Sequence, residues 1–181
     1  MSFGVYVHYP YCAKVCPYCD FNVVARRQIP HARYTDAVLA ELQLRGPRFL
    51  DRGELVSIYF GGGTPGLWPP GQIARVVDAL GSYFNVCSAV EISLELNPEN
   101  ATLIGLKSLR EAGFNRLSLG AQSFDRRLLN QLGRQHSESD IERALEWAAC
   151  GGFDNINIDL IHGYFGQGIG DALADIDKAI A

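Results

Sequence analysis

The sequence predicts an α/β fold, an incomplete and open (β/α) barrel with parallel strands. Short apolar runs alternate along the chain with longer stretches of helical character, which is the βα repeat of a parallel sheet. Within the later runs polar and apolar residues also alternate, so one face of the sheet is predicted to be polar. About five βα units are present, and we expect the barrel to be truncated.

The apolar runs place the strands, and the stretches between them place the helices. The predicted strands cover residues 3–9, 54–61, 90–96, 116–121 and 154–161. The predicted helices cover residues 31–45, 70–84, 101–112, 138–150 and 169–180, with Thr35, Pro70, Thr102 and Ser137 near the starts of four of them. Each strand is thus followed by a helix, as parallel strands require.

The last three strands carry their polar residues on one face, because successive side chains of a strand point to opposite faces. The apolar face would hold Ile92, Leu94, Leu96, Leu117, Leu119, Ile156, Ile158 and Leu160. The polar face would hold Glu91, Ser93, Glu95, Arg116, Ser118, Gly120, Gln122, Asn155, Asn157 and Asp159. A sheet buried on both faces, or a barrel with a packed apolar interior, would not alternate in this way. We therefore expect helices on the apolar face and a ligand site in a polar lumen, toward the C-terminal strand ends.

The whole-chain composition predicts one globular domain that binds a small molecule. The chain has 181 residues, of which 48% are hydrophobic, and its 16 basic and 20 acidic residues form no run of like charge. Neither nucleic acid nor an anionic membrane surface is an expected partner. The sequence has no apolar stretch long enough to span a membrane and no secretion signal, so the expected location is the cytoplasm.

Three of the five cysteines, Cys12, Cys16 and Cys19, form a C-x3-C-x2-C motif directly after the first predicted strand. Thiolates are soft ligands, and three of them on a short loop can hold three irons of a [4Fe–4S] cluster and leave the fourth iron open. Two alternatives are a zinc site completed by His8 and a structural or disulfide role. Cys87 and Cys150 stand alone and are expected to be small core residues.

A second motif, Gly61-Gly62-Gly63-Thr64-Pro65, lies at the end of the second predicted strand. Consecutive glycines allow the backbone to approach a ligand closely and to adopt positive φ. Such a turn is a weak signal by itself, because glycine-rich turns before helices are common without any ligand. Its place, one βα unit after the cysteine loop, makes it a candidate ligand-binding strand end.

The aromatic Tyr18 before the last cysteine makes the cysteine motif resemble the signature of the radical SAM superfamily. That resemblance implies that the open iron chelates S-adenosylmethionine and that one electron from the cluster cleaves its sulfonium bond. It also implies that the strand end from Gly61 to Pro65 binds the methionine amino group. The protein would position both cofactors and exclude water.

Further segments resemble one branch of that superfamily, the oxygen-independent coproporphyrinogen III oxidases and their HemW relatives. The matching segments are residues 6–12, 19–22, 61–65, 94–98, 120–124, 133–136 and 157–161. The resemblance implies a cofactor pocket lined by Tyr6, Tyr18, Gly62, Gly63, Thr64, Glu95, Gln122, Arg134 and Asp159. Glu95 and Asp159 would offer carboxylates to ribose hydroxyls or cationic groups, and Arg134 would pair with an anionic group. Residues 1–181 would be the radical SAM core, a partial barrel without the family's C-terminal domain.

Phe21 favours the HemW type. Oxidases of this family carry a further cysteine two positions after the last ligand, where this sequence has Phe21. HemW-type proteins are regarded as heme chaperones. The resemblance therefore implies binding of the cluster, S-adenosylmethionine and heme or a porphyrin, with an electron donor and a heme-accepting protein as further partners.

Two other functions stay open. One is an oxygen-independent coproporphyrinogen III oxidase, in which the radical removes hydrogen from propionate side chains before decarboxylation. The other is an inactive, truncated radical SAM domain. The sequence also departs from the family at residues 163–166, Gly-Tyr-Phe-Gly, where Gly-Leu-Pro-Gly is usual, so a rigid turn is replaced by a softer one.

Overall fold

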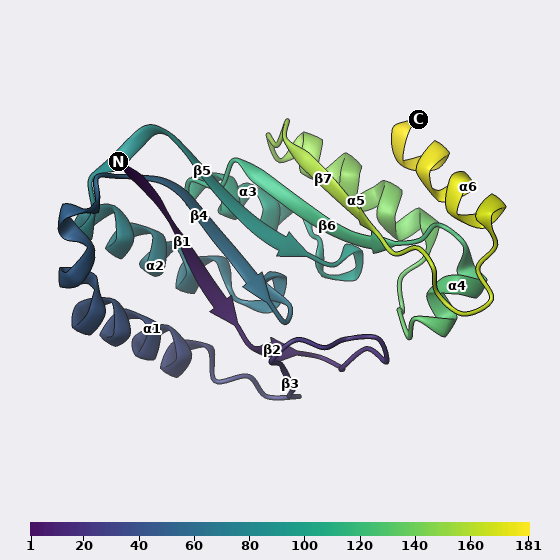
Figure 1. Ribbon diagram of the computed structural model, residues 1–181, viewed down its shortest axis with the longest axis horizontal. Helices are drawn as coiled ribbons and strands as arrows, with labels where there is room; N and C mark the ends of the chain where they lie inside the picture. The colour runs from purple at the N-terminus through teal and green to yellow at the C-terminus, as the bar shows by residue number, and fades with distance from the viewer.

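A five-stranded sheet in which every pairing is parallel organises the chain (Figure 1). The computed structural model describes residues 1–181. The strands lie in the order β1-β4-β5-β6-β7, so each strand pairs with the next one of the sheet along the chain. Their bounds are Ser2–Tyr9, Glu54–Gly62, Val86–Leu96, Arg116–Gln122 and Ile156–Leu160. The sheet is not closed, which confirms the predicted open, incomplete barrel.

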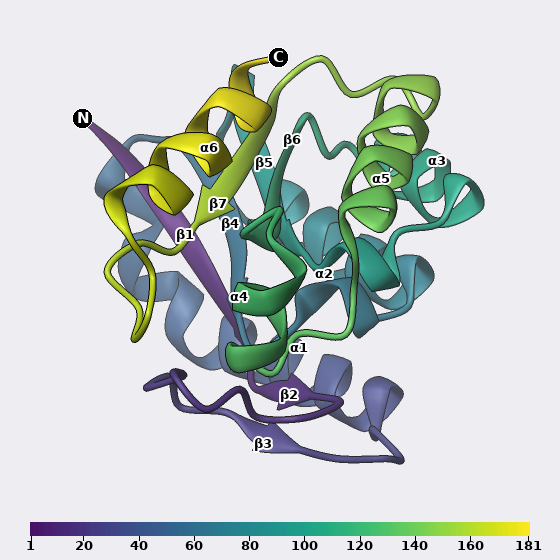
Figure 2. The same cartoon turned by 90° about the vertical axis from the view of Figure 1, so that its right-hand side faces the viewer.

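The helices that connect these strands lie mainly on one face of the sheet. They are α1 (His31–Arg45), α2 (Pro70–Tyr83), α3 (Leu103–Glu111), α4 (Arg126–Gln131), α5 (Glu138–Cys150) and α6 (Ile169–Ile180). Helices α1, α2, α3 and α5 form one layer in this order, each beside the next (Figures 1 and 2). Helix α6 follows β7 and lies apart from that layer (Figure 2). No helix is long and apolar enough to cross a membrane.

Short elements that sequence patterns do not reveal complete the fold. They are a two-residue parallel bridge between β2 (Tyr11–Cys12) and β3 (Val24–Ala25), and 3₁₀ turns at Gly46–Arg52, Pro65–Leu67 and Pro98–Asn100. Helix α4 was not predicted either, because six residues are too few to show a helical period. Its start is fixed locally by Asp125, whose side chain accepts a hydrogen bond from Arg127 N at 2.6 Å.

The helix layer and the apolar sheet face enclose the hydrophobic core. Phe60 of β4, Leu94 of β5 and Leu117 of β6 are almost fully buried there. Thr35 does not start α1 as expected, because the helix begins four residues earlier at His31. The Thr35 hydroxyl instead donates to His31 O at 2.9 Å and accepts from Trp68 Nε1 at 3.0 Å, so it satisfies a buried indole inside the core.

The other sheet face is polar, as the alternation predicts. Glu95 pairs in register with Ser118, and Ser118 pairs with Asn157, so polar side chains from three strands lie side by side. The expectation for Cys150 was wrong, because it lies near the end of α5 and is exposed, and Cys87 is only half-buried. Whether a helical cysteine such as Cys150 is buried depends on which face of the helix packs on the sheet, and the residues next to the cysteine do not show this.

Candidate functional site

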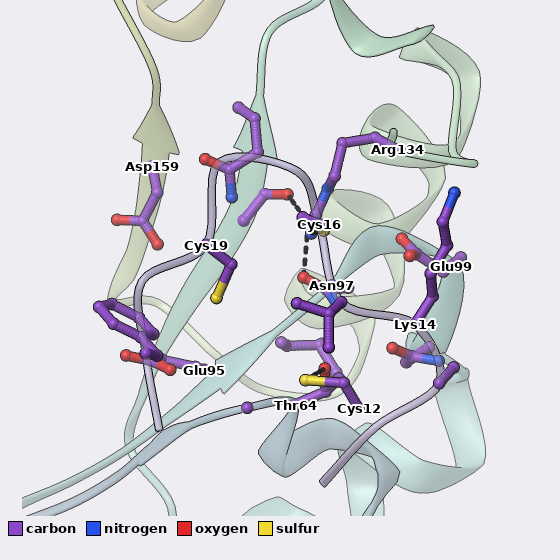
Figure 3. Close-up of a pocket in the computed structure, with 18 of the residues that line it drawn as sticks. Cys12, Lys14, Cys16, Cys19, Thr64, Glu95, Asn97, Glu99, Arg134 and Asp159 are labelled. Atoms are coloured by element: carbon purple, nitrogen blue, oxygen red, sulfur yellow. Dashed lines mark hydrogen bonds between the residues drawn. The ribbon is translucent and has the colours of Figure 1, made fainter. Parts of the chain in front are cut away.

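A cavity of about 600 Å³ lies at the C-terminal ends of β4, β5, β6 and β7, under the cysteine loop (Figure 3). It is within the size range of small-molecule sites. All predicted site residues except Tyr6 line it: Cys12, Cys16, Tyr18, Cys19, Gly62, Gly63, Thr64, Glu95, Gln122, Arg134 and Asp159. The structure thus gathers, in one place, residues that are as many as 147 positions apart in the sequence.

Tyr6 lies just outside this cavity. Its ring is 57% exposed and stacks on Tyr59, with 6.0 Å between the ring centroids. Tyr59 does line the cavity, and its hydroxyl donates to Glu95 Oε1 at 2.7 Å. A direct role of Tyr6 at the cavity therefore stays a prediction, while its stacking supports a residue that does line it.

The cysteine loop is closed at its base by the short bridge between β2 and β3. Val24 N donates to Pro10 O at 2.8 Å, and Arg26 N donates to Cys12 O at 3.0 Å. Within the loop, Cys19 N donates to Cys16 O at 3.0 Å, which turns the chain between the last two cysteines. Cys12 is buried, and Cys16 and Cys19 are half-buried.

Two side chains from distant segments point to thiol sulfurs. Thr64 Oγ1 donates to Cys12 Sγ at 3.6 Å, and Arg134 Nη1 donates to Cys16 Sγ at 3.8 Å. Burial raises the pKa of the Cys12 thiol, and the Thr64 hydrogen bond opposes that rise. Burial also raises the pKa of Tyr18 to about 12, so its phenol is neutral at physiological pH. These hydrogen bonds stabilise sulfur as an acceptor, which suits metal-bound thiolates.

The backbone at the glycine-rich strand end is packed tightly against the cysteine loop. A Cβ at Gly63 would lie 2.9 Å from Cys12 Sγ and 2.7 Å from Tyr11 O. Gly62 has φ 116° and donates its N–H to Glu95 Oε2 at 3.0 Å. Only glycine fits at these two positions, because one has no room for a side chain and the other requires a left-handed backbone.

The geometry gives no support to the zinc alternative. His8 uses both ring nitrogens elsewhere, since Nδ1 is 3.0 Å from Tyr6 Oη and Nε2 is 2.9 Å from Asn22 O. No group of three or more His, Cys, Asp or Glu side chains converges closely enough to hold one metal ion. A [4Fe–4S] cluster makes a different demand, because each thiolate binds its own iron and the sulfurs do not converge on one point.

Two of the three carboxylates that line the cavity, Glu95 and Asp159, lie in different environments (Figure 3). Glu95 accepts hydrogen bonds from Tyr59 and Gly62, but its burial raises the pKa of its carboxyl above the ordinary value. Asp159 accepts from Ser118 Oγ at 2.9 Å and from Asn157 Nδ2 at 2.7 Å. Both side chains are thus oriented by neighbours, and both could accept hydrogen bonds from a hydroxyl or a cationic ligand.

Arg134 brings positive charge into the cavity without a carboxylate partner. Its Nη2 donates to Asn97 Oδ1 at 2.6 Å and to Gly120 O at 2.8 Å. Its Nε is buried and has no hydrogen-bond partner. A half-buried guanidinium that lines a cavity and has no carboxylate partner is suited to an anionic ligand group.

Gln122 occupies a strained position at the end of β6. It is the one non-glycine residue with positive φ, at 67°. The register between β6 and β7 shifts just before it, and its carbonyl accepts from Ile161 N at 2.9 Å. Strain of this kind is frequent at functional sites, since the surrounding structure must impose it.

Sequence reasoning missed several lining residues, among them Lys14, Tyr59, Asn97 and Glu99. Tyr59 lies in a mainly apolar run, so its side chain gave no sign of facing the polar side. Asn97 and Glu99 lie after the end of β5, where strand alternation no longer applies. Asn97 shares the parity of Glu95, and extending that pattern by one step would have found it.

Comparison with known proteins agrees with this geometry. The model of the radical SAM superfamily matches residues 6–179. A heme chaperone HemW from Haemophilus influenzae is 37% identical over 181 residues, which covers 98% of this chain and 47% of that protein. An oxygen-independent coproporphyrinogen III oxidase from Salmonella typhimurium is 39% identical over 161 residues, which covers 88% of this chain and 35% of that protein.

Solved structures show the same likeness. The coproporphyrinogen III oxidase of Escherichia coli, a radical SAM enzyme, superposes with a TM-score of 0.87 and 34% identity over 97% of this chain and 41% of that one. The chain therefore spans about half the length of the HemW protein and less of the two oxidases.

Proposed function

This chain belongs to the radical SAM superfamily, and from that premise we propose that it binds a [4Fe–4S] cluster and S-adenosylmethionine and acts as a HemW-type heme chaperone. The observation that carries the first part is the cavity itself. Three thiols, three carboxylates and an arginine without a carboxylate partner line one space at the strand ends. That set offers soft ligands for iron together with groups of both charges for a zwitterionic cofactor.

The cysteine loop would hold the cluster through Cys12, Cys16 and Cys19. The donor set fits, because three thiol side chains on one short closed loop face the cavity and two of them receive hydrogen bonds. Lack of a side chain at Gly63 leaves room beside Cys12. When bound, the two cofactors supply one-electron chemistry at the sulfonium of S-adenosylmethionine.

The remaining lining residues would bind and orient S-adenosylmethionine. Arg134 offers its positive charge to the carboxylate of the methionine part. Glu95 and Asp159 offer carboxylate oxygens to the ribose hydroxyls or to the ammonium group, with Tyr59 and Ser118 holding them in place. Gly62, Gly63, Thr64 and Gln122 contribute a close backbone surface, and Tyr18 shields the cluster side from water.

The branch assignment depends on Phe21. Phe21 lines the cavity and is 65% exposed, so an apolar ring stands where the oxidase branch carries a further thiol. The 37% identity to a heme chaperone over nearly the whole chain supports the same branch, although a 39% identity to an oxidase covers a shorter stretch. Heme or a porphyrin, an electron donor and a heme-accepting protein are the partners that this function requires.

We also propose that residues 1–181 form one radical SAM core, which the family match to residues 6–179 supports. We also propose a cytoplasmic location, because cluster binding needs reduced thiols and the cytoplasm keeps thiols reduced.

Heme transfer and decarboxylation distinguish the chaperone from the oxidase. After anaerobic reconstitution, the protein is titrated with hemin and mixed with apomyoglobin, and in parallel it is given coproporphyrinogen III, S-adenosylmethionine and a reductant. We expect bound heme that passes to apomyoglobin and no carbon dioxide release. Decarboxylation of coproporphyrinogen III would overturn the chaperone assignment in favour of the oxidase, and a protein that does neither would favour an inactive domain.

A further inference from the structure

A buried histidine directly behind the cavity wall contacts a glutamate that lines the cavity. His136 is 1% exposed, and its Nδ1 lies 3.1 Å from Glu99 Oε2. Its Nε2 lies 2.8 Å from the backbone oxygen of Ala121 on β6. Glu99 itself lines the cavity from the turn after β5, whereas His136 is not among the lining residues.

Both ring nitrogens of His136 face atoms that accept hydrogen bonds. A carbonyl oxygen can only accept, so Nε2 carries a proton, and a second proton lies between Nδ1 and the Glu99 carboxyl. Burial by itself raises the pKa of Glu99, but the hydrogen bond with His136 and the charge of Arg134 outweigh it and hold that pKa below the ordinary value. The imidazole of His136 thus joins the end of β6 to the Glu99 carboxyl through both ring nitrogens.

Arg134, two residues before His136, also forms a hydrogen bond with the end of β6. Arg134 donates to Gly120 O, and His136, two residues later, donates to Ala121 O. On the side of β5, Arg134 donates to Asn97 and His136 to Glu99. Residues 134–136 thus form hydrogen bonds with two consecutive backbone carbonyls at the end of β6 and with two side chains after β5. The two carbonyls directly precede Gln122, which has the strained backbone.

We propose that Glu99 and His136 are positioning residues, which set Arg134 and the end of β6 in the arrangement that receives the anionic end of the cofactor. This inference rests on the proposed function and extends it to residues outside the predicted site. A pair of ionisable groups at a partly buried site is a poor source of stability, because the desolvation of both groups offsets their attraction. Its best-supported use is to select one arrangement among several, and here that arrangement fixes a cationic side chain 3.8 Å from Cys16 Sγ.

The test compares His136→Gln, Glu99→Gln and the double variant with a matched control, His31→Gln. His31 is also a partly buried histidine with one side-chain hydrogen bond, 2.9 Å from Tyr9 Oη, but it lies outside the cavity lining. In reconstituted protein we measure the dissociation constant for S-adenosylmethionine, the midpoint potential of the cluster and the iron content. We expect each single variant at the pair to bind the cofactor about 10–100-fold more weakly, as other supports of ligand-binding groups do, with iron content unchanged.

The double variant should bind no more weakly than the worse single variant, because both substitutions break one pair. The control should bind as wild type does. Wild-type affinity and potential in the pair variants would overturn the inference, and so would an equal loss in the control, since that loss would show a general structural effect.

A measurement on the metal-free protein keeps the inference separate from the proposed function. In protein carrying nitrogen-15 histidine, Nε2 of His136 should show a directly bonded proton, and the Nδ1 signal should shift in Glu99→Gln. A bare Nε2, or an Nδ1 signal that Glu99→Gln leaves unchanged, would overturn the inference whether or not a cluster forms. Failure of wild type to take up a cluster, with both hydrogen bonds of His136 present, would count against the proposed function alone.

Discussion

The two faces of the sheet carry opposite chemistry on the same strands. Leu94 and Glu95 are neighbours on β5, yet Leu94 is fully buried beneath the helix layer and Glu95 faces the cavity. On β6 the same alternation sets Leu117 against Ser118. The covered face is organised for stability, because apolar burial is favourable wherever it occurs. The cavity face holds charged groups under partial burial, which costs stability and is typical of binding sites.

The largest expected loss of stability follows from a substitution on the covered face. Leu94→Ala leaves a cavity among Phe60, Leu117 and their neighbours, and the free energy of unfolding should fall by about 2–5 kcal/mol. Urea unfolding followed by circular dichroism measures this. Ser93→Ala, one position earlier on β5, is the control and should cost less, because it removes only a hydroxyl. An equal loss of unfolding free energy in the two variants would contradict the idea that the covered face contributes more to stability than the cavity face.

A smaller effect is expected in the helix layer, at the start of α5. Asp140 accepts from Ser137 N at 2.8 Å, and the hydrogen bonds from Ser137 lower the pKa of its carboxyl to about 2. Asp140→Ala should therefore destabilise the protein by about 1 kcal/mol at neutral pH. A lowered folded-state pKa contributes stability above the unfolded value of about 4, and this stability is lost as the pH falls from about 4 to about 2.

The unfolding free energies of wild type and Asp140→Ala, measured from neutral pH down to pH 2, test this pH dependence. The difference in unfolding free energy should be largest at neutral pH and should shrink toward pH 2. A difference that stays constant with pH would show that the carboxylate charge does not matter to the cap.

The smallest expected change in stability is on the cavity face, and there the substitution should stabilise the protein. Burial raises the pKa of Glu95, so the ionised carboxylate is held at a cost in the metal-free protein at neutral pH. Glu95→Gln should stabilise that protein by about 0.5 kcal/mol, because the charge is removed while the amide oxygen can still accept from Gly62 N and the amide NH2 can donate to the Tyr59 hydroxyl. The contribution of a raised pKa is present at low pH and is lost as the pH rises through the folded value, so the variant's advantage should grow with pH.

Thermal unfolding at several pH values would show this advantage, and titration calorimetry of the reconstituted variant should show weaker binding of S-adenosylmethionine. If Glu95→Gln destabilises the metal-free protein, the carboxylate serves the fold and the contrast between the two faces is lost at this position.

The sequence predicted those features that depend on nearby residues. Alternation in residues 90–96 and 116–121 was enough to place Glu95 and Gln122 on the polar face, and the spacing of the three cysteines was enough to place one loop. Contacts that depend on how distant segments approach were not predictable from local patterns. Arg134 meets Cys16 across 118 positions, and His136 meets Glu99 across 37. Such contacts can be predicted only when the order of the strands in the sheet is known.

Anaerobic reconstitution with iron and sulfide shows whether the cysteine loop holds a cluster. Wild type, Cys16→Ala and the matched control Cys87→Ala are reduced and compared by visible absorption and paramagnetic resonance, with and without S-adenosylmethionine. We predict a [4Fe–4S] signal in wild type and the control, perturbed by S-adenosylmethionine and lost in Cys16→Ala. A folded wild type without a cluster, or a cluster that survives Cys16→Ala unchanged, would contradict the account.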